Sequence, residues 1–205
     1  MQLNTIRNAG MGCLALLLLS ACTVVGLDSS GNPIIPTDPS AGPDFANQTP
    51  AQIAQGFWAS KIVPAAHTKA LDWAAVKQVQ SRLKDTQTQS VYARISGKIT
   101  GLDTEGLARK LTVNVNGESV VMQLGPIITG NAVRDAAGFI RFDDFKNQVQ
   151  FAQVAKALNK QALSGLPALD ASWIGQSVDV LAAFTLSPKS LDDGVPMEIK
   201  RGATQ

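Results

Sequence analysis

RKLTVNVNGESVVMQL, residues 109–124, is the stretch that decides the fold class. Apolar and polar side chains alternate on both sides of Asn116-Gly117, and this period of two predicts two half-buried strands. Asn-Gly strongly favours a two-residue hairpin turn, because both turn positions need a positive φ. The stretch therefore predicts an antiparallel hairpin, with Val120, Met122 and Leu124 on one face of the returning strand.

Further strand patterns lie on both sides of this hairpin. Residues 91–102 predict a strand that the turn at 103–106 joins to the hairpin, and residues 177–186 and 197–201 predict two more strands. Three strands, a helix and two strands is the element order of a small barrel of the OB type. We expect an α+β fold over residues 89–205, mainly an antiparallel OB-like Greek-key barrel. A generic α+β sheet with helices on one face is the alternative.

A long helix is predicted between the third and fourth strands. Asp143 or Asp144 begins it, with acidic charge at the positive end of the helix dipole, and Gly165 ends it after residue 164. Its apolar face is unusually broad, and we expect the helix to plug one end of the barrel. Before it, residues 139–142 predict either another strand or an irregular segment. The apolar face includes Phe145, Val149 and Leu158.

Two N-terminal helices are expected over residues 49–88. Thr49-Pro50 begins the first with a hydroxyl N-cap and a proline at the first helical position, and Pro64 ends it. The second covers residues 65–84 or 68–84, where apolar residues recur at three- and four-residue spacing.

Residues 1–21 predict a bacterial lipoprotein signal peptide. Arg7 supplies a positive start, and the eleven-residue apolar run from Met11 to Ala21 is shorter than the roughly 20 residues of a membrane span but typical of a secretory signal. The run ends in Leu19-Ser20-Ala21-Cys22, which resembles a lipobox. The resemblance implies that the chain is cleaved before Cys22, which is acylated on its sulfur and on its new amino group. An ordinary cleaved signal peptide is the alternative.

Residues 22–48 predict a tether behind this lipidated cysteine. The composition favours an extended chain, because proline recurs and little apolar surface is available to bury. Thr23 stands where an aspartate would resemble an inner-membrane retention signal, which favours the outer membrane. We therefore expect the protein on the periplasmic face of a bacterial membrane. The prolines are Pro33, Pro36, Pro39 and Pro43.

Composition excludes several classes of function. The chain has 18 basic and 16 acidic residues, and a formal charge of +2 gives no electrostatic case for binding nucleic acid. Two cysteines and one histidine exclude a multi-cysteine zinc module and a histidine-rich metal site, so we expect no cofactor and no metal. We also expect no enzymatic activity, because no Gly-x-Ser-x-Gly or His-Glu-x-x-His motif is present. A carboxylate-dependent hydrolase is the weaker alternative.

The segment 125–148, GPIITGNAVRDAAGFIRFDDFKNQ, is the candidate site. Arg134 offers a planar fork of donors for a carboxylate, a phosphate or sugar hydroxyls, and Asp135 can accept from a ligand hydroxyl. Asn147 and Gln148 offer both donors and acceptors. These four residues predict a polar ligand-binding patch. The alternative is structural: Arg134 pairs with a nearby acid to hold the loop, because buried polar groups need partners with or without a ligand.

Several of these features together resemble a family of predicted periplasmic lipoproteins of unknown function. The resemblance covers most of residues 50–186 and is most specific over residues 125–159, whereas the proline-rich tether departs from it. Family members are often encoded beside components of sugar-type ABC uptake systems, which implies an accessory role. The family has no established catalytic residues. The features that carry the resemblance are the lipobox, a tryptophan-bearing helix before Pro64, Gly125-Pro126, Gly130, Arg134-Asp135, Phe142, Phe145, Asn147-Gln148, Val154-Ala155 and Leu158-Asn159.

The expected function is a lipid-anchored, non-catalytic binding or accessory module. Its expected partners are the membrane, through Cys22, an envelope or ABC-transporter protein, and a small polar ligand such as a sugar. A structural envelope lipoprotein that makes only protein–protein contacts is the alternative from a different class of function.

Overall fold

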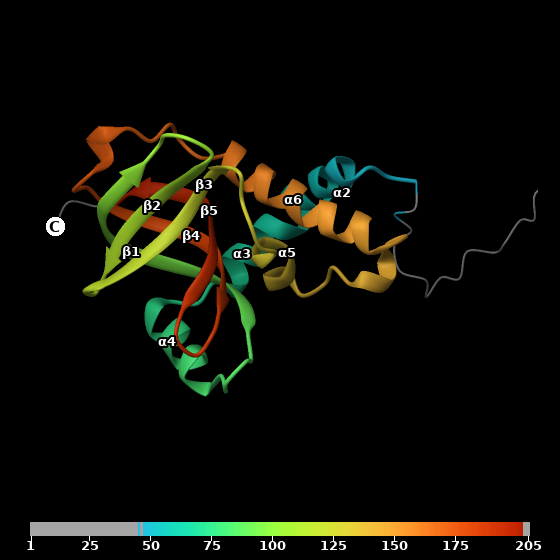
Figure 1. Cartoon of the computed structure of the whole chain (residues 1–205), viewed down its shortest axis with the longest axis horizontal. Coiled ribbons are helices and arrows are strands. Elements are labelled where there is room, and N and C mark those ends of the chain that lie inside the picture. The colour runs from blue at the N-terminus through green and yellow to red at the C-terminus, as the bar shows by residue number, and fades with distance from the viewer. Residues whose placement is uncertain (1–44, 46, 203–205) are drawn as a thin grey trace, which may run out of the picture. The chain divides into compact units, whose positions relative to one another are not determined.

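Five antiparallel strands form one sheet in the order β3-β2-β1-β4-β5 (Figure 1). This arrangement, with helices around it, confirms the predicted α+β class. The fourth strand has the predicted bounds, whereas the last begins at Leu191 rather than at residue 197 and includes Pro196. The strands are β1 (Gln89–Asp103), β2 (Ala108–Val115), β3 (Glu118–Pro126), β4 (Ser177–Leu186) and β5 (Leu191–Arg201).

The structure is a computed structural model, and it describes residues 45 and 47–202. All of these residues belong to one unit of the chain, residues 42–205. Cys22, the predicted signal peptide and most of the predicted tether lie outside the described residues.

The sheet curls because β1 pairs with a different neighbour at each of its ends. Residues Gln89–Lys98 pair with β4, and Lys98–Asp103 pair with β2. The curl brings the two edge strands together, so that a Cβ on Gly194 of β5 would lie only 2.7 Å from the carbonyl oxygen of Val121 in β3. The curled sheet is the OB-like barrel that the order of elements predicts.

Alternating side chains fill the inside of this barrel. In β4 the even-numbered residues point inward, and Phe184 is completely buried. The predicted hairpin contributes Val120 and Met122, which confirms their expected place on one buried face. The inner core contains Val91, Ala93, Ile95, Ile99, Leu111, Val113, Val115, Val120, Met122, Val178, Val180, Ala182, Phe184, Leu186 and Ile199.

The helix that covers one end of the inner core is α4 (Trp73–Arg82), not the long helix that we expected there. Val76 is completely buried in the inner core, and Trp73 and Val79 pack beside it. The cause lies just before the helix, where Leu71 forms a parallel bridge with Ala93 of β1. This bridge holds the start of α4 against the sheet, and Figure 1 shows the helix lying across the end of the barrel.

The long helix α6 (Gln148–Ser164) packs instead on the outer face of the sheet. Leu158 is completely buried there, in one cluster with Leu181 and Ala183, the odd-numbered residues of β4. The Tyr92 hydroxyl of β1 donates to the carbonyl oxygen of Val133 at 2.8 Å, and burial raises the pKa of this phenol. The other elements of this outer layer are α2 (Pro50–Phe57), η2 (Trp58–Ile62), α3 (Val63–Lys69) and α5 (Ala132–Ala137).

Phe45 is also part of this outer layer. Its ring stacks on Phe145 with 5.0 Å between centroids and meets the edge of Phe57 at 5.4 Å. Gln150 fixes the adjoining backbone, because its side-chain amide donates to the carbonyl oxygens of Phe45 and Gln48. The packed body therefore includes Phe45, which the sequence analysis assigns to the tether.

Pro64 does not end the first N-terminal helix. The helical path continues through the π-helical turn η2, and Pro64 lies in the first turn of α3, where a missing N–H costs little. The real break comes at residues 70–72, after which Asp72 caps α4 by accepting from Ala75 N. The second predicted helix is consequently divided between α3 and α4.

The long helix also begins later than predicted. Asp143 and Asp144 lie in the 3-10 turn η3 (Phe142–Asp144), whereas Asn147 caps α6 by accepting a hydrogen bond from Gln150 N. Residues 139–141 are irregular and form no strand. Because α6 begins at Gln148, Val149 lies in its first turn and is 63% exposed, so its predicted inward position is wrong. Phe145 and Leu158 are buried as predicted.

We predict that Val76→Ala lowers the free energy of unfolding by about 2–3 kcal/mol, because it removes apolar area and leaves a cavity at the covered end of the barrel. The exposed Gln78 of the same helix is the matched control, and Gln78→Ala should change stability by no more than about 0.5 kcal/mol. Urea unfolding midpoints measure both effects. Equal midpoints for the two variants would contradict the placement of α4.

Candidate functional site

The predicted polar patch is held together by its own side chains. Arg134 lies in α5 and is only 6% exposed. Its Nε donates to Asp135 Oδ1 at 2.7 Å, its Nη1 donates to the carbonyl oxygen of Phe151 at 3.1 Å, and its guanidinium stacks 3.7 Å from the centre of the Phe151 ring. These contacts link α5 to α6. They are those of a structural brace, the alternative that the sequence analysis leaves open.

Asn147 and Gln148 lie at the start of α6 and are both exposed. The Asn147 side chain is occupied as the N-cap of the helix, where it accepts from Gln150 N at 2.9 Å. Among the hydrogen bonds between described residues, none joins Asn147 or Gln148 to Arg134 or Asp135. The four predicted residues therefore form two separate pairs, one in α5 and one at the start of α6.

Two glycines of the same segment have positive φ angles, a backbone conformation that favours glycine. Gly125 has φ +73° and Gly130 has φ +80°. A Cβ on Gly125 would lie 2.9 Å from Leu163 Cδ1, and one on Gly130 would lie 2.1 Å from Asp193 Cγ. Both positions require glycine, and the one at residue 125 lets α6 approach the end of β3 closely.

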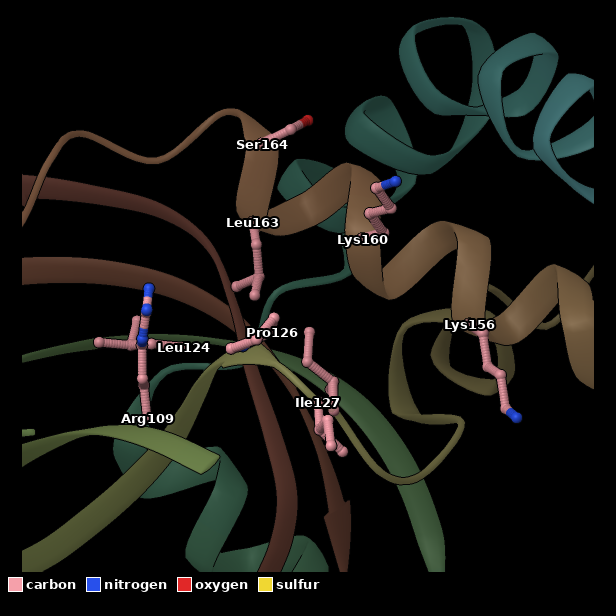
Figure 2. Close-up of a pocket in the computed structure, with 9 residues that line it drawn as sticks. Arg109, Leu124, Pro126, Ile127, Lys156, Lys160, Leu163 and Ser164 are labelled. Carbon is pink, nitrogen blue, oxygen red and sulfur yellow. The ribbon is translucent and has the colours of Figure 1, made fainter. Parts of the chain in front are cut away.

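A groove of about 690 Å³ lies where α6 passes the end of β3. Figure 2 shows Leu163 pointing from α6 towards Pro126, with Arg109 on the side of β2. We call this feature the cationic groove, because three of the residues that line it are basic and none is acidic. It is lined by Arg109, Leu124, Pro126, Ile127, Ile128, Lys156, Lys160, Leu163 and Ser164.

The three cations of the cationic groove form no ion pair with the described residues. None of the ion pairs formed within that part of the chain includes Arg109, Lys156 or Lys160. Arg109 Nε donates only to the carbonyl oxygen of Gly106, at 3.2 Å. Lys156 and Lys160 are four residues apart on one helix, and like charges at that spacing destabilise a helix by about 0.2–0.5 kcal/mol. The groove thus carries a small electrostatic cost that no described ion pair offsets.

A β-bulge shapes the strand side of the groove. Arg109 pairs with Gly125 and Lys110 pairs with Gln123, so Leu124 is the extra residue of β3. Leu124 and Leu163 also line an adjoining hollow of about 290 Å³, which extends the groove towards residues 166–169. The two hollows share Arg109, Leu124 and Leu163 as lining residues.

His67 takes part in a polar network that joins α3 to the sheet. Arg94 Nη2 lies 3.0 Å from His67 Nδ1, and His67 Nε2 lies 2.6 Å from Glu198 Oε1. Because arginine only donates, Nδ1 of the neutral ring accepts, and Nε2–H donates to the carboxylate. Partial burial works to raise the pKa of Glu198, but the hydrogen bonds from His67 and Lys200 and the charge of Lys200 outweigh it and hold that pKa below its ordinary value.

Two searches of the described residues bear on other kinds of site. Within residues 45 and 47–202, no group of three or more histidine, cysteine, aspartate or glutamate side chains is arranged to hold a metal ion. In the same part of the chain, every helix is too short or too polar to cross a membrane.

Sequence reasoning missed the cationic groove, although part of its signal is visible. Lys156, Lys160 and Leu163 share one face of a predicted helix at four- and three-residue spacing. Arg109 and Ile127 come from strand ends, and their position opposite this face depends on the packing of α6 outside the sheet. A helix placed as a barrel plug gives no reason to bring these residues together.

Comparisons with known proteins agree with the sequence features and the fold. A family described as predicted periplasmic lipoproteins (DUF2291) matches residues 13–200. A solved structure of an OB-fold protein from Thermotoga maritima MSB8 is similar, with a TM-score of 0.53 and 16% sequence identity over 75% of this chain and 98% of that chain. This likeness supports the OB-like fold alone. A search of the curated proteins finds no match to the sequence.

We predict that Arg134→Ala lowers the free energy of unfolding by about 3 kcal/mol or more, because it removes a buried cation that joins two helices. Arg134→Lys should recover part of the loss, since lysine keeps the charge but lacks the planar fork and its stacking. Urea midpoints of the two variants and the wild type test this. The brace assignment fails if Arg134→Ala unfolds at the wild-type midpoint.

Proposed function

This chain belongs to the DUF2291 family of predicted periplasmic lipoproteins, and on that premise we propose that it is a non-catalytic binding module whose ligand site is the cationic groove. Family membership implies association with a membrane. The predicted polar patch around Arg134 is the weaker candidate for a ligand site, because the guanidinium is already engaged by Asp135 and Phe151.

The observation that carries the proposal is the group of three cations without ion-pair partners over an apolar floor. Arg109 comes from β2, and Lys156 and Lys160 come from α6, yet all three border one depression. Most exposed lysines of the described chain form no ion pair either, so these three cations are distinguished by bordering the same depression. Convergence of polar groups on an apolar pocket of about 300–1,000 Å³ is typical of ligand sites, and the groove is within that range.

We propose that the anchor of this module is Cys22, lipidated after cleavage of residues 1–21. The lipobox-like ending Leu19-Ser20-Ala21-Cys22 supports this assignment, and Thr23 favours the outer membrane. Several acyl chains on one residue give an effectively permanent attachment, since each buried CH₂ contributes about 0.8 kcal/mol.

An accessory role in sugar-type ABC uptake is the proposed setting of this module. It rests on the family resemblance, and a partner protein of the envelope would be its physical counterpart. If the protein were instead a structural lipoprotein with protein contacts only, its function would not depend on the groove cations. Substitution of these cations therefore distinguishes the two functions.

We predict that Cys22→Ala releases the protein from membranes, because the acyl chains can no longer be attached. Cell fractionation after a high-salt wash and labelling with radioactive palmitate measure the effect. Ser20→Ala is a suitable control, because it keeps a small residue before the cysteine and should leave labelling intact. Membrane retention of Cys22→Ala after the salt wash would rule out the anchor.

We predict that a variant of the groove cations does not restore sugar uptake to cells that lack the protein, whereas a variant of a surface lysine outside the groove does. A strain lacking the gene is complemented with wild type, with Lys156→Gln/Lys160→Gln, or with Lys110→Gln, an exposed lysine that does not line the groove. Uptake of labelled sugars should return with wild type and Lys110→Gln but not with the double variant at equal protein levels. Full uptake with the double variant would contradict a binding role for the groove.

A further inference from the structure

We propose that the cationic groove binds a single-chain organic anion, namely a carboxylate or phosphate monoester head on an aliphatic body. The proposal rests on the assignment of the groove as the ligand site under the proposed function, and it adds the chemical class of the ligand. It follows from the separation of the lining residues into an apolar floor and a cationic border.

The apolar half of the groove suits an aliphatic chain. Leu124, Ile128 and Leu163 line it without being completely buried, and Ile127 is 56% exposed. A second exposed aliphatic residue is close in the backbone, because Ile127 N donates at 3.0 Å to the carbonyl oxygen of Leu107, which is 63% exposed. A chain lying on this surface would remove apolar area of both molecules from water.

The cationic half suits a compact anionic head. Lys156 and Lys160 are one helical turn apart on α6. Figure 2 shows their ammonium groups pointing away from each other, so the two flexible side chains must change rotamer to reach one anion. Arg109 stands on the opposite, strand side of the groove (Figure 2) and offers a planar fork that matches a carboxylate or phosphate. An anion placed between them would supply the counter-charge that these cations lack among the described residues.

A neutral sugar fits these lining residues less well. It would leave the three cations without a counter-charge, and the groove is lined by no aromatic ring on which a sugar face stacks. It is lined by no carboxylate either, so an acceptor for sugar hydroxyls would have to come from the backbone or from Ser164. Inorganic phosphate alone would satisfy the charge but leave the apolar floor exposed to water.

Calorimetric titration separates these ligand classes. The protein is the mature chain, residues 22–205, made without acylation as Cys22→Ala, a position outside the described fold. The probes are octyl phosphate, octyl glucoside and inorganic phosphate, each below any critical micelle concentration. We expect octyl phosphate to bind at least about tenfold more tightly than either of the others, as one added charge-assisted hydrogen bond or one buried aliphatic chain would give.

Variants assign this binding to the groove. Lys156→Gln/Lys160→Gln should weaken octyl phosphate by about tenfold or more, and Ile127→Ser should weaken octyl phosphate but not inorganic phosphate. Lys110→Gln makes the same charge change outside the groove and should bind as wild type does. All four positions are exposed, and thermal melting confirms that each variant is folded.

Three outcomes would overturn the ligand class. They are equal affinity for octyl glucoside and octyl phosphate, equal affinity of the double variant and the wild type, and binding to phosphatidylglycerol vesicles without binding to free octyl phosphate. The last outcome would assign the groove to a bilayer surface. None of these results decides the proposed function itself, because the separate uptake experiment tests whether sugar uptake in cells needs the groove.

Discussion

Burial of β4 on both of its faces is the constraint on which the rest of the structure depends. Val180 and Phe184 fill the inside of the barrel, while Leu181 and Ala183 lie in the outer core. An antiparallel sheet often buries one face and leaves the other in water. A second buried face requires an outer layer, which is supplied by helices before β1 and between β3 and β4. Because α6 packs in this outer layer, α4 and not α6 covers the end of the barrel.

The outer layer also determines where the cationic groove lies. α6 runs along the outside of the sheet, and Leu163 near its end meets β3 at Gly125, where any side chain would stand in the way. This contact carries Lys156 and Lys160 past the strand ends that bear Arg109. The groove is therefore a product of how a helix packs on a sheet, and its charged residues come from regular elements. Such elements hold side chains more precisely than loops do.

Local patterns predict the parts of this molecule that local physics decides. The hairpin at Asn116-Gly117 and the strand over residues 177–186 follow from turn chemistry and alternation, and both are present. The start of α6 does not follow in this way, because Asp143 and Asn147 are both good N-caps and only the tertiary packing selects one. The groove is harder still to predict, since no sequence pattern indicates that Arg109 and Lys156 lie close together. The patch around Arg134 is recognisable as a polar cluster, but its burial is not.

Some charged residues of this chain stabilise the fold and others are available to bind a ligand, and burial and ion pairing distinguish the two groups. Arg134 is the more conspicuous residue in the sequence, yet its fork is used by Asp135 and by the Phe151 carbonyl. A ligand at this position would have to displace contacts that join two helices, and leaving the buried arginine without its partners is costly. Lys156 and Lys160 keep their ammonium groups in water beside an apolar floor, so an incoming anion replaces only water. The less conspicuous charges therefore offer the larger net gain on binding.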